Sequence, residues 1–276
     1  MRLIHTLPLS VINQTLNYMR NLIFFLLLFI GTNTYSQDIF LMNLSKSRSK
    51  PLQSSKLFKE TTVYYTIYYP ENVPKSKLVT HFNTNGKPVL LLSYDEKDIL
   101  KQRSTITYDS TQTHVIGQKV ENSDPDIGFN TIFESNQYDS NGLLTNIIQN
   151  DEEGKMIQET RITYNEKGDP ILVKNYVGNV FKKGTAKYNY ELNEVTIKQY
   201  NWAGELRNTK IFPIIFDKPQ PGDIVNQYGD IIKSSTSENE IKYDEFGNWI
   251  KKVYSRIVDG KLLKGSEDVR TIIYKN

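Results

Sequence analysis

A five-residue pattern recurs along this chain and restricts the fold more than any other feature of the sequence. It begins with an aromatic residue, continues with Asp or Asn, and ends with glycine after two variable residues. The copies are FNTNG (82–86), YDSNG (138–142), YNEKG (164–168), YNWAG (200–204) and YDEFG (243–247). Three degenerate copies are NDEEG (150–154), which lacks the aromatic residue, and YDEKD (94–98) and YDSTQ (108–112), which lack the glycine.

The second and fifth positions of the pattern have the chemistry of a tight turn. Asp and Asn side chains accept a hydrogen bond from the backbone amide two residues further on. Glycine reaches positive φ without a Cβ clash, and Asp98 is expected to adopt this conformation in a copy that lacks glycine. The pattern therefore predicts a type I turn followed by a left-handed residue, which closes a hairpin loop. The turn residues are Asn83, Gly86, Asp139, Gly142, Asn165, Gly168, Asn201, Gly204, Asp244 and Gly247.

Short β-prone runs flank these turns. They include VYYTIYY (63–69), PVLLLSY (88–94), LLTNII (143–148), PILVKNY (170–176) and WIKKVY (249–254). Aromatic residues also recur every 12 residues from Tyr164 to Phe212, which is about one strand plus one turn. No long segment keeps a helical period. We predict an all-β fold, an antiparallel meander of repeated hairpins that forms a long twisted or curled sheet. Each tyrosine is expected to pack against its neighbouring strand. The proline-rich segment 211–222 should interrupt the meander, as an edge-covering loop or an interaction site.

The N-terminal part has the pattern of an export signal. In residues 19–37, a methionine and an arginine precede nine apolar residues, Leu22 to Ile30, and then small and polar residues. The run is too short to span a bilayer but fits a secretory signal peptide. We expect a signal peptide over 1–36, with Met19 as an alternative start, a Ser- and Lys-rich linker over 37–60, and a β-hairpin repeat domain over 61–276. The mature chain is then periplasmic, on the cell surface or secreted.

The segments YDEFGNWIKKV (243–253) and YDSNGLLTNII (138–148) resemble the YD repeats of the RHS family. The resemblance extends over about residues 80 to 276. It implies a β-sheet built from hairpins and an exported location. Large members of that family enclose a toxin domain, but here only two residues follow Tyr274, so we expect no toxin domain. DPDIG (124–128) is compared with the family's self-cleaving segment, and we interpret it as a chance match.

The composition argues against several kinds of chemistry. The chain has no cysteine, which excludes disulfides and thiolate chemistry. Beyond residue 36 there are 32 basic and 31 acidic residues, a balance that gives no indication of nucleic-acid binding. His81 and His114 have no partner at metal-ligand spacing, and carboxylate pairs such as Glu152 and Glu153 fall in turns. We therefore assign no catalytic residue, metal or cofactor.

Two tryptophans are the candidate ligand-binding residues. Trp202 lies inside a turn, where its ring should be exposed, and Trp249 follows a turn glycine by two residues. Such rings stack on sugars or anchor protein partners, whereas a ring folded over the sheet edge is a structural alternative, particularly for Trp249. The expected function is an exported, non-catalytic scaffold or binding module for carbohydrate or an envelope protein. The alternatives are a polysaccharide hydrolase that uses turn carboxylates and an accessory or immunity partner of a toxin-type repeat protein.

Overall fold

The computed structural model describes residues 57–68, 73–123, 129–214, 219 and 222–275. Its secondary structure there is entirely β, with seventeen strands and no helix among the described residues. The described chain therefore contains no helix that is long and apolar enough to cross a bilayer. The strands belong to two units. The described part of unit 1 comprises 137–148 and 156–214, and unit 2 comprises the other described residues. The predicted all-β antiparallel meander is confirmed.

Unit 2 contains two sets of consecutive hairpin strands. The first set is β1 (Phe58–Ile67), β2 (Val73–Phe82), β3 (Pro88–Tyr94), β4 (Leu100–Tyr108), β5 (Val115–Asn122) and most of β6 (Asn130–Tyr138). The second set is β13 (Ile224–Val225), β14 (Ile231–Lys233), β15 (Ser237–Tyr243), β16 (Trp249–Val258) and β17 (Lys261–Tyr274). Each strand pairs antiparallel with the next strand of its set.

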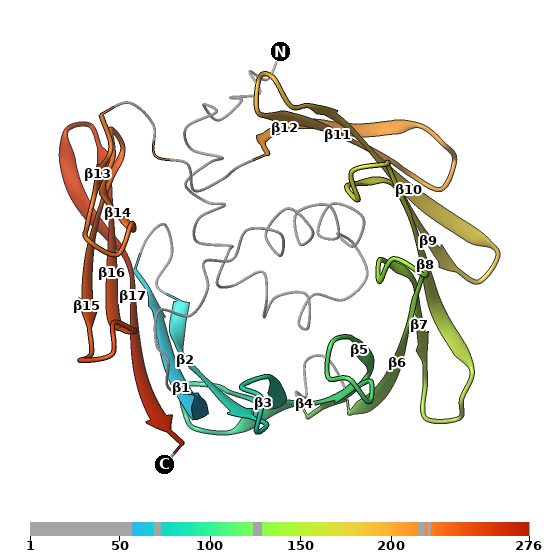
Figure 1. Cartoon of the computed structure of the whole chain (residues 1–276), viewed down its shortest axis with the longest axis horizontal. Helices are drawn as coiled ribbons and strands as arrows, with labels where there is room; N and C mark the ends of the chain where they lie inside the picture. The colour runs from blue at the N-terminus through green and yellow to red at the C-terminus, as the bar shows by residue number, and fades with distance from the viewer. Residues whose placement is uncertain (1–56, 69–72, 124–128, 215–218, 220–221, 276) are drawn as a thin grey trace. The chain divides into compact units, whose positions relative to one another are not determined.

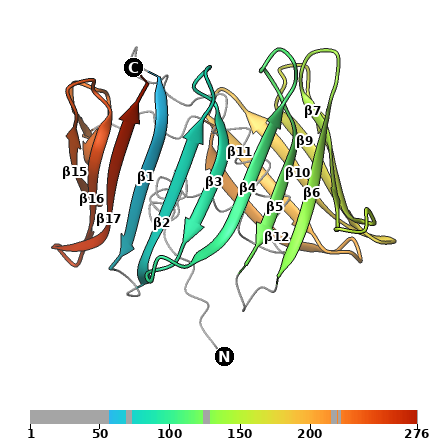
Figure 2. The same cartoon turned by 90° about the horizontal axis from the view of Figure 1, so that it is seen from below.

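The two sets are joined by their most distant strands. β1 pairs with β2 on one side and with β17 on the other, from Phe58 opposite Tyr274 to Ile67 opposite Ser266. Figures 1 and 2 show β1, in blue, lying between β2 and the dark red β17. This pairing was not predicted, since a simple meander pairs only neighbours along the sequence.

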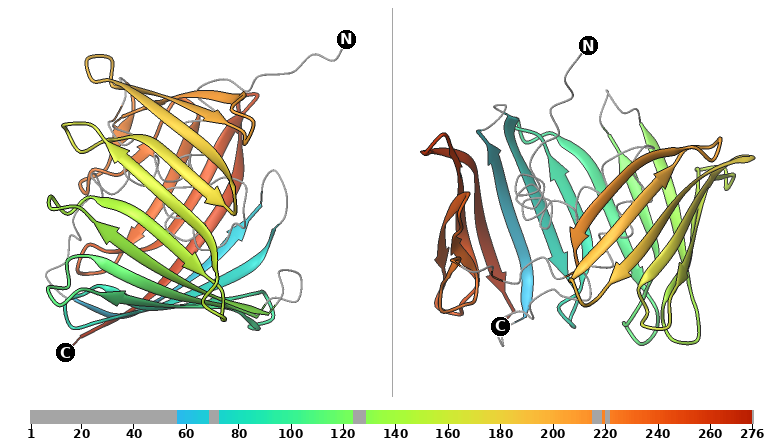
Figure 3. Two further views of the ribbon diagram at one scale, coloured as in Figure 1. Left: turned by 90° about the vertical axis from the view of Figure 1, so that its right-hand side faces the viewer. Right: turned by 90° about the horizontal axis from the view of Figure 1, so that it is seen from above.

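Unit 1 contains most of β7 (Leu144–Asn150) and the consecutive strands β8 to β12. These are β8 (Met156–Tyr164), β9 (Pro170–Val177), β10 (Val180–Asn189), β11 (Glu194–Tyr200) and β12 (Leu206–Pro213). The antiparallel pairs run in chain order from β8 to β12, as the yellow and orange strands of Figure 3 show. β12 extends to Pro213, so the expected break at 211–222 begins later than its first residue.

The predicted turns are present and have the predicted chemistry. The φ angles of the turn glycines are 73° at Gly86, 77° at Gly142, 78° at Gly168, 81° at Gly204 and 79° at Gly247. In the 164–168 turn, Asn165 Oδ1 accepts hydrogen bonds from the amides of Lys167 and Asp169, both at 2.9 Å. The Gly168 amide donates to the Asn165 carbonyl at 3.0 Å. The side chain at position two thus binds the amide two residues on, as predicted, and also the amide four residues on.

The same loop forms where the sequence pattern is incomplete. Asp98 has φ 61°, which confirms its predicted left-handed conformation, and Gln112 has φ 59° in the other copy without glycine. A further loop, NQYGD (226–230), was missed because no aromatic residue precedes Asn226. There the Asn226 side chain accepts bonds from the amides of Tyr228 and Asp230, at 2.9 and 3.0 Å.

Tyrosines at or near strand ends, some of them from the pattern, contact the turns of neighbouring hairpins. Three of them donate their phenol proton to the carbonyl of the residue that begins the preceding strand. These pairs are Tyr108 with Pro88 (3.0 Å), Tyr164 with Leu144 (2.7 Å) and Tyr188 with Pro170 (2.9 Å). Two others bond to turn carboxylates instead: Tyr243 with Asp230 (2.5 Å) and Tyr274 with Asp244. The packing of tyrosine against its neighbouring strand was predicted, but these hydrogen bonds were not.

Both units bury apolar and polar side chains. In unit 1 the buried cluster is apolar, namely Ile162, Val173, Ala186, Val195, Ile197, Phe212 and Ile214. In unit 2 the buried residues include apolar ones such as Phe58 and Leu78, and polar ones, namely Thr61, Thr80, Gln102 and Ser104 among others. Gln102, Asn122 and Asn130 face one another across three strands and form a chain of amide hydrogen bonds of 2.7 and 2.6 Å. Unit 2 therefore contains a polar layer that apolar burial alone does not explain.

Replacing Gly168 with alanine should lower the free energy of unfolding by about 1 kcal/mol, because an L-residue is strained in the left-handed region. A Cβ at this position would meet only ordinary contacts, the nearest being Leu143 Cδ2 at 3.8 Å, so backbone strain is the main cost. Urea unfolding followed by circular dichroism measures the loss. The control is Glu166→Ala at an exposed position of the same loop, which should change stability by less than about 0.5 kcal/mol. Equal effects of the two changes would show that the left-handed conformation at position 168 does not cause the loss of stability.

Several expectations concern residues outside the described ranges. These are the signal peptide over 1–36 and the DPDIG segment at 124–128, together with most of the linker. The last residues of the expected linker are described, and there β1 begins at Phe58, three residues before the expected start of the repeat domain.

Candidate functional site

Trp202 lies exposed at the end of a hairpin in unit 1. Its side chain is 68% exposed, and Leu206 in the same hairpin is 53% exposed. The loop below it is closed by Asn201, whose side chain accepts the amides of Ala203 and Glu205 at 3.0 and 2.9 Å. The predicted exposure of Trp202 is thus observed. Among the described residues, however, no polar group that would orient a ligand contacts its ring.

Trp249 has different surroundings, at the start of β16 in unit 2. Its ring is half-buried, with the Arg270 guanidinium 4.0 Å and the Lys252 ammonium 4.6 Å from the ring centroids. Its carbonyl oxygen accepts a hydrogen bond from Arg270 Nε at 2.8 Å. Trp249 is therefore not an open stacking platform. Its ring and carbonyl hold Arg270 in place.

Arg270 belongs to a group of polar side chains that the sequence analysis missed. Asp268 and Arg270 are two residues apart on β17, so their side chains leave the sheet on the same face. Tyr65 of β1 is directly opposite Asp268, and Lys252 of β16 is opposite Asp268 on the other side. The β1–β17 pairing thus brings residues from both ends of the described chain onto one face. We call Tyr65, Asp268 and Arg270 the β1–β17 site.

Arg270 is a desolvated cation with few protein partners. Besides the Trp249 contacts, its guanidinium lies 5.8 Å from the Phe58 ring. Among the described residues, no carboxylate lies within ion-pair distance of it, and its two terminal amino groups have no acceptor. Burial lowers the pKa of Arg270 to about 10, against smaller opposing effects of Tyr274, Asp244 and Tyr65. A cation costs free energy in such a position unless something pairs with it.

Asp268 and Tyr65 are also half-buried without hydrogen-bond partners among the described residues. Burial raises the pKa of Asp268 to about 6; Lys252 opposes this and Glu267 adds to it. Burial likewise raises the pKa of the Tyr65 phenol, and Asp268 contributes. Buried polar groups in native proteins are usually hydrogen-bonded, and clusters of exceptions are common at functional sites. Three adjacent half-buried polar side chains with few protein partners make this face the strongest candidate for a ligand site.

Aromatic rings border the site at the end of β17. Phe58 packs edge-on against Phe82 and Tyr274, at centroid distances of 5.6 and 5.7 Å, and Phe246 packs against Tyr274 at 4.8 Å. Lys275 closes this end, since its amide donates to the Leu57 carbonyl at 3.0 Å. Rings and backbone bonds therefore fix the strands that position Asp268 and Arg270.

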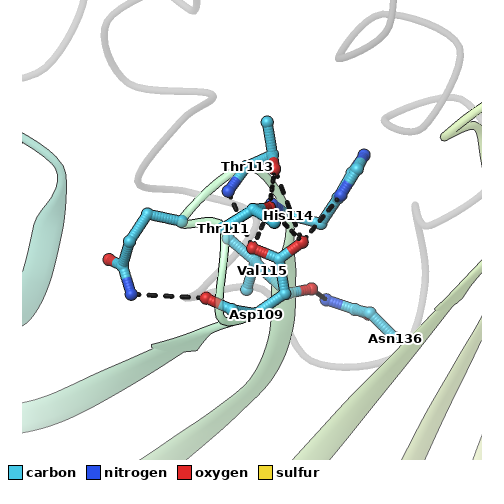
Figure 4. A network of polar contacts seen from close by, with 7 residues as sticks. Asp109, Thr111, Thr113, His114, Val115 and Asn136 are labelled. Atoms are coloured by element: carbon cyan, nitrogen blue, oxygen red, sulfur yellow. Dashed lines mark hydrogen bonds and ion pairs between the residues drawn. The ribbon is translucent and has the colours of Figure 1, made fainter.

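A second polar network surrounds Asp109 in the 108–112 turn of unit 2. Figure 4 shows its carboxylate between Thr111, Thr113 and His114, with Asn136 bonded to the Val115 carbonyl nearby. The Thr113 amide donates to Oδ1 at 2.7 Å, and His114 Nδ1 lies 3.1 Å from Oδ2. Although burial alone would raise the pKa of Asp109, hydrogen bonds from His114, Thr113 and Thr111 hold it well below its usual value.

The Asp109 network stabilises a loop whose left-handed position is Gln112 rather than glycine. Gln112 is held in turn by Asn83, whose amide donates to Gln112 Oε1 at 2.7 Å. The hydroxyls of Thr111 and Thr113 donate to the Asp109 carboxylate, which also orients His114. This arrangement caps the loop and is not that of a nucleophile paired with a base. His81 similarly contacts Glu60, at 3.2 Å. The described residues contain no cluster of three His, Cys, Asp or Glu side chains that could hold a metal ion.

Comparison with known proteins gives distant similarities only. No protein family matches the chain, and no curated protein matches it significantly. Among solved structures, a porin-like protein from Bacteroides uniformis ATCC 8492 is 10% identical over 81% of this chain and 100% of its own, with a TM-score of 0.30. TcdB2-TccC3-TEV is 10% identical over 72% of this chain and 14% of its own, with a TM-score of 0.33. TcdB2-TccC3-Cdc42 is 9% identical over 78% and 16%, with a TM-score of 0.26. At these values the similarities carry no argument about function.

Proposed function

We propose that this chain is an exported, non-catalytic repeat protein of the YD-repeat type that acts as a binding module. Its ligand is carbohydrate, with an envelope protein as the alternative partner. The observation that carries the proposal is the β1–β17 site, where Tyr65, Asp268 and Arg270 are half-buried side by side. Among the described residues Tyr65 and Asp268 have no hydrogen-bond partner, and Arg270 bonds only through Nε, to the Trp249 carbonyl. A scaffold gains nothing from such groups, whereas a ligand can satisfy them.

The repeat type is supported by the chemistry of the turns. The Asp or Asn at position two closes its own loop, the glycine takes positive φ, and the tyrosine covers a neighbouring turn. These three roles account for the three fixed positions of the YD-like pattern. Export is supported by the apolar run in residues 19–37, which has the length and flanks of a secretory signal.

A binding role is favoured over hydrolysis by the positions of the carboxylates. The turn carboxylates are engaged in their own loops, as Asp139 Oδ1 is by the amides of Asn141 and Leu143, at 2.9 and 2.8 Å. At the β1–β17 site, Glu267 is adjacent to Asp268 in the strand, so its side chain points to the opposite face. Glycoside hydrolysis requires two carboxylates facing one substrate.

The test uses the full chain with a C-terminal tag, expressed in a bacterial host and fractionated. We expect it outside the cytoplasm, and we expect the purified chain to bind polysaccharides on a glycan array without releasing reducing ends. Trp249→Ala, which removes the ring that holds Arg270, should weaken binding at least about fivefold, about 1 kcal/mol.

The matched control is Trp202→Ala, because Trp202 lies exposed in the other unit. It should leave binding unchanged. Loss of binding in Trp202→Ala alone would place the ligand at the hairpin end. It would contradict the proposal that the ligand binds at the β1–β17 site. Release of reducing ends that is lost on replacement of a turn carboxylate would show the hydrolase alternative to be correct. Capture of an envelope protein without glycan binding would favour the protein partner.

A further inference from the structure

The Arg270 guanidinium is held in a fixed orientation by contacts that use only part of its hydrogen-bonding capacity. Nε donates to the Trp249 carbonyl at 2.8 Å, and the Trp249 ring lies 4.0 Å from the guanidinium carbon. These contacts leave the two terminal amino groups as a planar fork. Such a fork matches the two oxygens of a carboxylate better than any other protein cation does.

The carboxylates near Arg270 do not neutralise it. Asp244 is engaged elsewhere, because its Oδ1 accepts the amides of Phe246 and Asn248, both at 2.9 Å, and its Oδ2 accepts the Tyr274 phenol. Asp268 is on the same face, yet the two side chains form no ion pair. Among the described residues, the half-buried positive charge of Arg270 therefore has no negative charge in contact with it. An anionic ligand would supply one.

The groups beside Arg270 indicate what else the ligand carries. Tyr65 and Asp268, opposite each other across β1 and β17, present a phenol and a carboxyl group. A phenol both donates and accepts hydrogen bonds, and a carboxylate accepts them, so the pair suits hydroxyl groups. A simple carboxylic acid would leave this pair unsatisfied, and a neutral sugar would leave Arg270 unsatisfied. One sugar unit that bears a carboxylate satisfies all three.

We propose that the β1–β17 site binds an acidic sugar unit, with its carboxylate on Arg270 and its hydroxyl groups on Tyr65 and Asp268. This inference rests on the proposed binding function and specifies its ligand. The chemistry is that of a hexuronic acid, free or within a polysaccharide.

The test is isothermal titration of the full chain with three probes: galacturonic acid, galactose and acetate. Galacturonic acid should bind at least about tenfold more tightly than either of the others, a difference of about 1.4 kcal/mol. Equal binding of galactose would show that the carboxylate of the sugar makes no contact with Arg270 that contributes to affinity. Equal binding of acetate would show a carboxylate site that ignores the sugar. Absence of galacturonic acid binding would overturn the inference, and binding of other glycans on the array would then leave the proposed function standing.

One variant of the full chain and one control test whether the ligand binds to Arg270. Arg270→Met keeps the length of the side chain and removes the buried charge, so it should abolish galacturonic acid binding while the Tm stays equal or rises. The control, Arg103→Gln, removes a positive charge from an exposed position on β4 in the same unit and should leave binding unchanged.

A purely structural role for Arg270 predicts the opposite pattern, namely a lower Tm in Arg270→Met with binding retained. If Arg270→Met does not fold, Arg270→Lys keeps the charge without the fork. Binding should then fall at least about fivefold, or 1 kcal/mol, and wild-type binding in Arg270→Lys would overturn the role of the fork.

Discussion

Replacing Asp244 with alanine should lower the free energy of unfolding by about 3 kcal/mol, since it removes three side-chain hydrogen bonds of about 1 kcal/mol each. Two of these close the 243–247 turn, from the amides of Phe246 and Asn248, and the third comes from the Tyr274 phenol at the end of β17. The loss of the third bond should weaken the β17 end that positions Arg270. Urea unfolding followed by circular dichroism measures the change.

The matched control is Asp151→Ala in the NDEEG turn, which has no aromatic residue at its first position. Its carboxylate accepts the Lys155 amide at 2.8 Å, and no tyrosine contact is found there. The expected loss is about 1 kcal/mol. A loss of only about 2 kcal/mol in Asp244→Ala, which its two amide bonds alone explain, would mean that the tyrosine–turn contact adds no stability, and the structural role given to the repeated tyrosine would be wrong.

Replacing Asp268 with asparagine should remove much of the pH dependence of stability between about pH 4 and 6. The folded pKa, about 6, lies above the ordinary value of 3.8 for an aspartate in an unfolded chain, so the folded protein binds this proton more tightly than the unfolded chain does. The stabilisation is fully present below pH 3.8 and is lost as the pH rises through 6. The difference of about two pKa units corresponds to on the order of 3 kcal/mol.

Asp268→Asn should therefore match the wild type near pH 4 and be more stable than it at pH 7. The charged and titratable groups around Asp268 are Lys252 on β16, Tyr65 on β1 and Arg270 and Glu267 on β17. Glu240→Gln, at an exposed position of β15, removes the same charge outside this environment and serves as the control. Thermal unfolding from pH 4 to pH 7 provides the comparison. Parallel curves for the wild type and Asp268→Asn would show that Asp268 is not desolvated as described.

The turns could be predicted from sequence because their chemistry is local. Each loop is closed within five residues by its own Asp or Asn, so residues such as Asn165 and Gly168 carry the information themselves. The 226–230 loop was not predicted because Val225 takes the place of the aromatic residue, which the loop geometry does not need. Gln112 takes a left-handed conformation without being glycine, since Asn83 and Asp109 hold its side chain.

The β1–β17 site could not be predicted, because Tyr65 and Asp268 are about 200 residues apart in sequence and meet only through strand pairing. Nothing in the β17 sequence distinguishes Asp268 from the exposed charges around it. The available signal was the spacing of Asp268 and Arg270, which places two charges on the same face of a strand as Ile272 and Tyr274. Trp249 was a candidate ligand-binding ring with a structural role as the alternative, and in the structure its ring lies against Arg270.

The insertion of β1 between β2 and β17 has a consequence for biosynthesis. β1 is among the first parts of the repeat region to be made, yet one of its two edges is paired only by the last strand. Until Tyr274 has left the ribosome, the backbone of β1 presents an unpaired edge, which is the surface that most readily joins a foreign strand. Contacts so distant along the chain also slow folding. A chain released early would therefore keep its N-terminal hairpins but lack Asp268 and Arg270, and it would carry an open edge prone to aggregation.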